Sequence, residues 1–201
     1  MISLEKGQRI SLEKNGSGLK EVCVGVNWGA IEKKGFLGGV KKVAVDLDAS
    51  VGTFDADKKI GSVVYFGDLI AFSGSISHSG DDRTGDMDGD DGLDNEIITI
   101  KMHSLPLTAD KIAVVLNSFG GHDFKSIPFA SIRLYEGTPT RVDNIIASYN
   151  IANDAKFSGS ISMVLGVLYR HNDGWKFRAI GEPTSDKNLK DTLSNVAANY
   201  L

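Results

Sequence analysis

Eight acidic side chains lie within residues 81–96 of this 201-residue chain, close enough in sequence to hold a metal ion together. Against one basic residue, Arg83, they give the segment a charge of −7, whereas the whole chain has a net charge of −4. The rest of the chain therefore carries +3. The acids are Asp81, Asp82, Asp86, Asp88, Asp90, Asp91, Asp94 and Glu96.

Carboxylates crowded in this way repel one another. Two unit charges about 4 Å apart repel by about 1 kcal/mol in water and by about 4 kcal/mol at an effective dielectric constant of about 20. A compact loop of this composition therefore needs a bound cation, and its charge argues against nucleic acid as a ligand. The alternative is a solvated, disordered acidic loop, which is what most charged runs form.

Calcium is the cation that this segment fits best. Ca²⁺ accepts about six to eight oxygen ligands in irregular geometry, which suits carboxylates separated by glycines. Mg²⁺ needs a stricter octahedron, and the segment has no interleaved His or Cys for zinc. The segment is not an EF-hand, because a pattern that starts at Asp86 puts Asp91 at the glycine position and Ile97 at the closing glutamate.

Acids elsewhere in the chain are placed to join this segment. Strand alternation over residues 43–49 puts Asp46 and Asp48 on one face, roughly 7 Å apart, where they can serve one ion or bridge two. Asp68, directly after an apolar strand pattern, is a third contributor. The predicted metal ligands are Asp46, Asp48, Asp68, Asp81, Asp82, Asp86, Asp88, Asp90, Asp91 and Glu96.

The elements that must position these acids are predicted to be strands. Apolar and polar residues alternate, β-branched residues are frequent, and 23 glycines punctuate the chain. The expected fold is an all-β sandwich of two mainly antiparallel sheets, in a single domain over residues 1–201, with a barrel as the alternative. The expected strands are 9–12, 21–26, 42–47, 62–66, 96–101, 111–116, 131–135, 145–149, 160–169 and 175–180, with a hairpin turn at Asp173-Gly174.

A C-terminal α-helix is the one departure from this pattern. Leu193 and Tyr200 fall on one apolar face of the predicted helix, which is expected to pack on the sandwich. The expected cap is Thr184, Ser185 or Asp186.

Neither a membrane span nor a secretory signal is predicted. The longest apolar stretches, residues 111–117 and 162–169, are under half of the roughly 18 residues that a spanning helix requires. The first residues include an early acid and no apolar region of the kind that signal peptides carry. We therefore expect a cytoplasmic protein.

Five segments, in order along nearly the whole chain, carry a family resemblance. They are residues 25–28 (GVNW), 46–50 (DLDAS), 78–91 (beginning HSGDD and ending DGDD), 168–171 (LYRH) and 175–181 (WKFRAIG). Together they resemble the TerD family of tellurium-resistance and stress proteins.

That resemblance implies a β-sandwich that binds two Ca²⁺ ions and is encoded beside other ter genes. It also implies partners among the other Ter proteins, including the integral membrane protein TerC, which would place the chain at the inner face of the membrane. The chain departs from the family at Asp68, where Asn is frequent, and at residues 90–96, where members often close the loop with Asp-Asp-Glu. The ligands that the resemblance implies are Asp46, Asp48, Asp81, Asp82, Asp88, Asp90, Asp91 and Glu96.

The sequence therefore predicts a calcium-binding stress-response protein associated with tellurite resistance, and not an enzyme. One alternative is a di-metal phosphoester hydrolase using Asp46, Asp48, Asp82 and Asp88, although no general base or phosphate cradle is evident. The other is a calcium-dependent lectin or adhesion module, against which the missing signal peptide counts.

Overall fold

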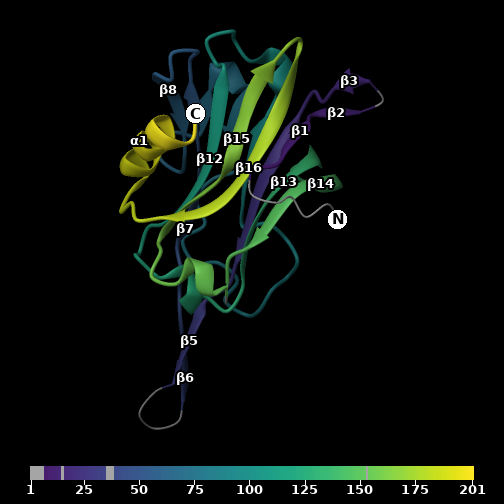
Figure 1. The fold of residues 1–201 in the computed structure, drawn as a ribbon. Coiled ribbons are helices and arrows are strands. Elements are labelled where there is room, and N and C mark those ends of the chain that lie inside the picture. Colours follow the sequence, from purple (N-terminus) through teal and green to yellow (C-terminus); the bar gives the residue numbers. More distant parts are fainter. Residues whose placement is uncertain (1–6, 15, 35–38, 153) are drawn as a thin grey trace.

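The computed structural model describes residues 7–14, 16–34, 39–152 and 154–201, and its strands form two antiparallel sheets that pack face to face (Figure 1). The first sheet has the order β1 (Arg9–Ser11), β16 (Gly174–Thr184), β15 (Ser162–His171), β12 (Lys111–Ser118), β7 (Leu47–Phe54), β8 (Ile60–Val64). The second has the order β14 (Arg141–Asn150), β13 (Ala130–Thr138), β4 (Val22–Trp28), β11 (Glu96–Ile100), β10 (Ile76–His78), β9 (Ile70–Ala71). The predicted all-β sandwich is confirmed.

Short elements complete the described part of the chain. Two hairpins are formed by β2 (Glu13–Lys14) with β3 (Ser17–Gly18) and by β5 (Ile31–Lys34) with β6 (Val40–Val43). The β5–β6 hairpin projects from one end of the sandwich (Figure 1). The 3-10 helices are η1 (Phe72–Gly74), η2 (Met102–Ser104), η3 (Phe124–Ser126) and η4 (Ala155–Phe157).

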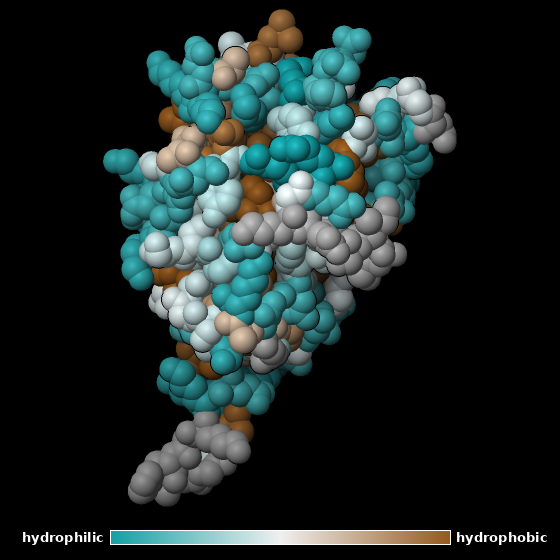
Figure 2. Space-filling model, in the orientation of Figure 1, coloured by the Kyte–Doolittle hydropathy of each residue, from teal (hydrophilic) through white to brown (hydrophobic). Residues whose placement is uncertain are grey.

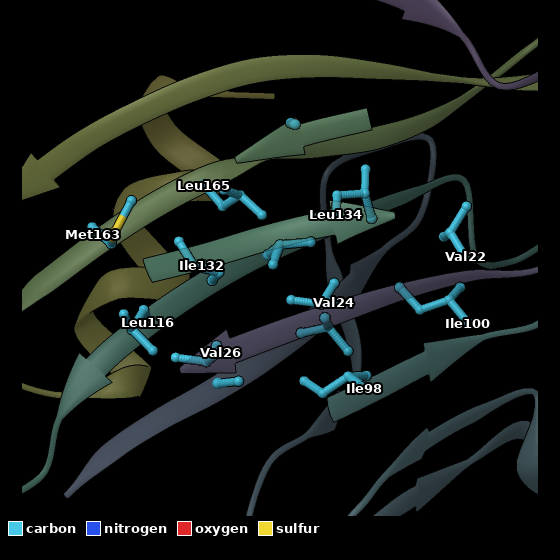
Figure 3. Packing of buried hydrophobic residues seen from close by; sticks show 14 of the residues in the cluster. Val22, Val24, Val26, Ile98, Ile100, Leu116, Ile132, Leu134, Met163 and Leu165 are labelled. Carbon is cyan, nitrogen blue, oxygen red and sulfur yellow. The ribbon is translucent and has the colours of Figure 1, made fainter. Parts of the chain in front are cut away.

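The main core lies between the two sheets (Figure 3). Val24 and Val26 of β4 are fully buried there, and so are Leu116 of β12 and Leu165 of β15 in the other sheet. Burial of one such side chain contributes about 1.5–3 kcal/mol to stability. Apolar contacts therefore hold the two sheets together along their length.

The predicted C-terminal helix, α1 (Leu189–Asn199), lies on the outer face of the first sheet (Figure 1). Leu193 and Val196 are buried in a second apolar cluster that includes Val115 of β12. The helix approaches β7 closely because Gly52 has no side chain, since a Cβ at that position would lie 2.7 Å from a methyl carbon of Leu193.

The predicted cap of this helix is wrong by several residues. Asn188 is the N-cap, and its Oδ1 accepts a hydrogen bond from the Asp191 backbone N–H at 3.0 Å. Thr184 is the last residue of β16, where it pairs with β15, so the helix cannot begin before the chain has left the sheet. Ser185 and Asp186 lie between the strand and the N-cap.

The predicted hairpin between β15 and β16 forms, but its turn is one residue earlier than expected. Gly174 is the first residue of β16 and pairs with His171. The turn residues are therefore Asn172 and Asp173, and Asn172 has a φ of 52°, a conformation that Asn tolerates better than most residues.

The strand predicted over residues 42–47 is divided between two elements. β6 ends at Val43 as part of the projecting hairpin, and β7 begins at Leu47 as part of the first sheet. The chain changes hydrogen-bonding partner between them, so Asp46 lies just before a strand and Asp48 lies within it.

Within the described residues, no helix is both long and apolar enough to cross a bilayer.

Candidate metal centre

The acidic segment is the connection between β10 and β11, and backbone hydrogen bonds hold it against the end of β4. The Asp86 N–H donates to the Trp28 carbonyl at 2.9 Å, and the Ala30 N–H donates to the Asp86 carbonyl at 3.2 Å. From the first sheet, the Val45 N–H, just before β7, donates to the Thr84 carbonyl of the acidic segment at 3.4 Å, and the Phe119 N–H after β12 donates to the Asp46 carbonyl at 3.0 Å. Acids from both sheets therefore meet at one end of the sandwich.

The first group of carboxylates consists of Asp46, Asp48 and Asp81, and it joins the start of β7 to the acidic segment. One oxygen from each lies within 4.8 Å of the other two. Asp48 is 5% exposed, and Oδ1 of Asp46 is buried without a hydrogen-bond partner in the described structure. An oxygen in that state lacks the partner that buried polar atoms normally have, and a cation would supply it.

The second group, Asp86, Asp90 and Asp91, lies entirely within the acidic segment, with the same 4.8 Å limit on its oxygens. Two amides orient it. Asn27 Nδ2 donates to Asp90 Oδ1 at 2.9 Å, and Asn95 Nδ2 donates to Asp86 Oδ1 at 2.9 Å. Each bonded carboxylate keeps lone pairs for an ion, because an ionised carboxylate has about four acceptor sites.

Burial and repulsion raise the pKa values of two carboxylates of the first group, Asp48 and Asp46. Burial raises the pKa of Asp48 to about 8, with further contributions from Asp46, Glu96 and Asp81. Burial, Asp81 and Glu96 raise the pKa of Asp46 to about 6, and the nearby positive charge of Arg83 opposes the shift. The charged form of this group is therefore unfavourable without a cation beside it.

Glu96 lies beside the first group and is fully buried, but the structure places it in neither group. Its Oε2 accepts the Ala49 N–H at 2.9 Å, and its Oε1 accepts the Asp82 N–H at 3.2 Å. His78 Nε2 lies 3.4 Å from Oε2, and His78 Nδ1 accepts the Gly80 N–H. Glu96 thus ties the start of β7 to the start of the acidic segment through backbone amides.

Asp82 is used to shape the loop and lies outside both groups. Its Oδ1 accepts the Thr84 N–H at 2.9 Å, the Thr84 hydroxyl at 3.0 Å and the Gly85 N–H at 3.0 Å. Burial by itself would raise the pKa of Asp82, but these bonds and one from Asn95 outweigh it and lower the pKa. Its carboxylate is therefore ionised and already well satisfied by the loop.

Two other predicted ligands are also outside the groups. The Asp88 side chain is 99% exposed and accepts a hydrogen bond from Lys42 Nζ at 3.0 Å. Asp68 is exposed in the turn between β8 and β9, where its backbone bonds to Tyr65. Of the ten predicted ligands, the structure brings six together in two groups of three.

The asparagines of the second group were missed as functional residues. Asn95 accepts the Trp28 backbone N–H at 2.8 Å through Oδ1, so it connects β4 to the carboxylate of Asp86. Trp28 is buried, and its indole N–H donates to the Val45 carbonyl at 2.7 Å. The available signal was the run Gly25–Trp28, which contains Asn27 and carried part of the family resemblance.

Asp94 belongs to the acidic segment but is neutralised by a basic partner. Arg133 Nη2 and Nε lie 2.9 and 3.2 Å from Asp94 Oδ2. The pair packs over Gly25, where a Cβ would lie 2.0 Å from that same oxygen. Asp94 therefore anchors the end of the loop to β4 and β13 and is not free to hold an ion.

Comparison with known proteins gives consistent matches. The family model described as "TerD domain" matches residues 1–200. The chain is 32% identical over 200 residues to "Tellurium resistance protein TerZ" of Serratia marcescens, covering 98% of each. It is 36% identical over 207 residues to "Stress response protein SCP2" of Bacillus subtilis (strain 168), covering 96% of this chain and 98% of that protein.

A solved structure shows the same fold. It is the crystal structure of a homologue of telluride resistance protein (TerD) from Streptomyces coelicolor A3(2), with a TM-score of 0.67 and 19% sequence identity. The match covers 90% of this chain and 96% of that chain.

Proposed function

The chain belongs to the TerD domain family, and on that basis we propose that it is a calcium-binding stress-response protein associated with tellurite resistance. The family resemblance predicted from the sequence is thereby confirmed. Relatives bear the names of tellurium resistance and stress response proteins.

The first group carries the proposal for metal binding. Asp46, Asp48 and Asp81 bring three carboxylates together, one of them nearly fully buried, and Arg83 is the basic side chain that opposes their repulsion. Removing carboxylates from water without a counter-charge is costly, so the arrangement favours a bound cation. Oxygen ligands on a flexible, glycine-containing loop suit Ca²⁺ better than Mg²⁺.

The second group supports a second ion. Asp86, Asp90 and Asp91 offer three further carboxylates, and side-chain amides orient two of them. Neither group contains a His or Cys ligand, which disfavours zinc. We therefore propose two calcium ions, one for each group.

Calcium would supply a positive charge that holds the acidic segment to the rest of the sandwich. At a free concentration about 100 times Kd, one site would stabilise the folded chain by about 2.7 kcal/mol. We propose that the calcium-loaded surface is read by other Ter proteins, including the membrane protein TerC, in the cytoplasm or at the inner face of the membrane. The role is binding and not catalysis, so no phosphoester hydrolysis is expected with Mg²⁺ or Mn²⁺.

Calorimetric titration with Ca²⁺ and Mg²⁺ tests the proposal. Wild type should bind two Ca²⁺ ions, Asp81→Asn should lose the site of the first group, and Asp91→Asn should lose the site of the second. Asp88→Asn is the matched control, because it removes the same charge from the same segment at an exposed side chain outside both groups. It should retain both sites.

Two results would reject the assignment. One is an absence of calcium binding by wild type at millimolar concentrations. The other is an unchanged stoichiometry of two in both group variants. The association with tellurite resistance is tested separately, by comparing growth on tellurite of cells that carry wild type or a double variant, Asp81→Asn with Asp91→Asn, in place of the native gene.

A further inference from the structure

A basic cavity lies on the outer face of the first sheet, beside the end of α1. It has a volume of about 130 Å³ and is lined by Arg9 of β1, Arg178 of β16, Lys111 of β12 and Tyr169 of β15, with Tyr200 closing it from the helix side. Hydrophilic residues are visible on this face of the molecule over β15 and β16, beside the helix end (Figure 2). We propose that this cavity binds a phosphate-sized oxyanion, either inorganic phosphate or the phosphate group of a small monoester.

Two arginines in the lining of this cavity repel each other. Arg9 and Arg178 are directly opposite each other on neighbouring antiparallel strands, a position where side chains are about 4.5–5.5 Å apart at Cβ. Like charges opposite each other are unfavourable. The pKa of Arg178 is lowered, first by burial and then by Arg9, which shows the same repulsion.

The described residues do not relieve this repulsion. No described carboxylate forms an ion pair with Arg9 or Arg178. Asp110 precedes the lining residue Lys111 in the chain and is already paired with it. Within the described residues, two guanidinium groups that are paired with no carboxylate therefore border the cavity, and an anion placed there would satisfy both.

The chemistry of the lining identifies the class of anion. The planar guanidinium fork matches the oxygens of a phosphate or a carboxylate in two parallel hydrogen bonds. The cavity is small, Val167 and the Leu201 side chain supply apolar walls, and the main-chain oxygen of Leu201 already accepts a hydrogen bond from Lys58 Nζ at 2.6 Å. The cavity therefore fits a single compact oxyanion group.

The competing explanation is that the arginines serve the carboxyl end of α1. A cation near a helix C-terminus contributes about 0.3–1 kcal/mol through the helix dipole. However, among the side-chain hydrogen bonds of the described residues, the one to the end of the helix segment comes from Lys58, to the Leu201 carbonyl, and not from Arg9 or Arg178. The two explanations predict different melting temperatures for a variant in which Arg9 is replaced, measured without anions.

The cavity is independent of the proposed calcium sites. Lys111 is the first residue of β12, whereas Ser118, the last, pairs with Leu47 beside the first carboxylate group. Seven residue steps along a strand place the two regions roughly 23 Å apart. Failure of calcium binding would therefore leave this proposal intact.

Titration with inorganic phosphate, in calcium-free buffer at fixed ionic strength, tests the site by calorimetry and by NMR shifts of backbone amides. Wild type should bind one phosphate with shifts centred on residues 169 and 178. Arg9→Gln and Arg178→Gln should each weaken binding at least tenfold, and Arg178→Lys should weaken it less. Lys176→Gln is the matched control, because Lys176 lies on the same strand and lines a different cavity.

Thermal unfolding separates the two explanations. Without phosphate, Arg9→Gln should melt at or above the temperature of wild type, because the substitution removes a repulsion. With phosphate, wild type should melt higher than Arg9→Gln. Because Arg9 is exposed, this variant is expected to fold even where Arg178→Gln does not.

Three results would overturn the proposal. The first is equal phosphate affinity in wild type and Arg9→Gln. The second is an equal rise in melting temperature with phosphate in both, which would show a general salt effect. The third is a lower melting temperature of Arg9→Gln without anions, which would assign the arginines to the helix end.

Discussion

Calcium binding to the first group is expected to release protons and to strengthen as the pH rises. Burial raises the pKa of Asp48 to about 8 and that of Asp46 to about 6, and an ion must displace any proton that these carboxylates carry. At pH 7 a group with the pKa of Asp48 is about 90% protonated and one with the pKa of Asp46 about 10%. Binding of one ion should therefore release about one proton.

The same values set the size of the effect on affinity. If both carboxylates must be ionised, the apparent affinity for calcium should increase about 100-fold between pH 6 and pH 8. Without calcium the dependence of stability on pH has the opposite sign. The folded-state pKa values lie above the unfolded value of 3.8, so the stability due to Asp48 and Asp46 is greatest below about pH 4. It is lost as the pH rises through about 6 and then about 8.

Calorimetry in two buffers of different ionisation enthalpy counts the released protons directly. The matched variant Asp48→Asn keeps the size of the side chain and removes its titration, so its proton release at pH 7 should approach zero. Its affinity should be lower than that of wild type at pH 8 and nearly independent of pH. Release below about 0.3 protons by wild type, or an affinity change under about threefold from pH 6 to pH 8, would refute the reasoning.

Two substitutions test the residues that shape the loop. Glu96→Gln should lower the free energy of unfolding by about 1–3 kcal/mol in urea denaturation, because one amide end cannot accept the N–H of both Ala49 and Asp82. Unchanged stability would show that these bonds contribute little. Asp94→Asn should lower the melting temperature, because Arg133 loses a charged partner, and should leave two calcium ions bound. Loss of an ion in this variant would make Asp94 a ligand.

The features that the sequence predicted correctly depend on residues close together in the chain. Alternation with a period of two indicates strands wherever one face is buried, and it predicted the sandwich. Apolar residues at helical spacing predicted the C-terminal helix. The sequence shows directly that acids are concentrated in residues 81–96. Their oxygen ligands indicate a hard cation. The motifs that identify the family are likewise short and local.

The boundaries that failed depend on pairing. Residues 42–47 look like one strand, but the chain leaves one hairpin at Val43 and enters the first sheet at Leu47. The helix begins after Asn188 because β16 keeps its partner through Thr184. Local sequence carries no record of which strand will be the neighbour.

The amino-acid sequence by itself determined the strand-rich fold class, the family and the region where negative charge gathers. Only the tertiary structure decided what each acid does, because a carboxylate has the same charge whether it holds a loop, pairs with an arginine or faces other carboxylates. The packing of two sheets brings Asp46 and Asp48 to Asp81, places Glu96 at the backbone amide of Ala49, and pairs Asp94 with Arg133. These contacts join residues far apart in the chain, so register and sheet packing set them.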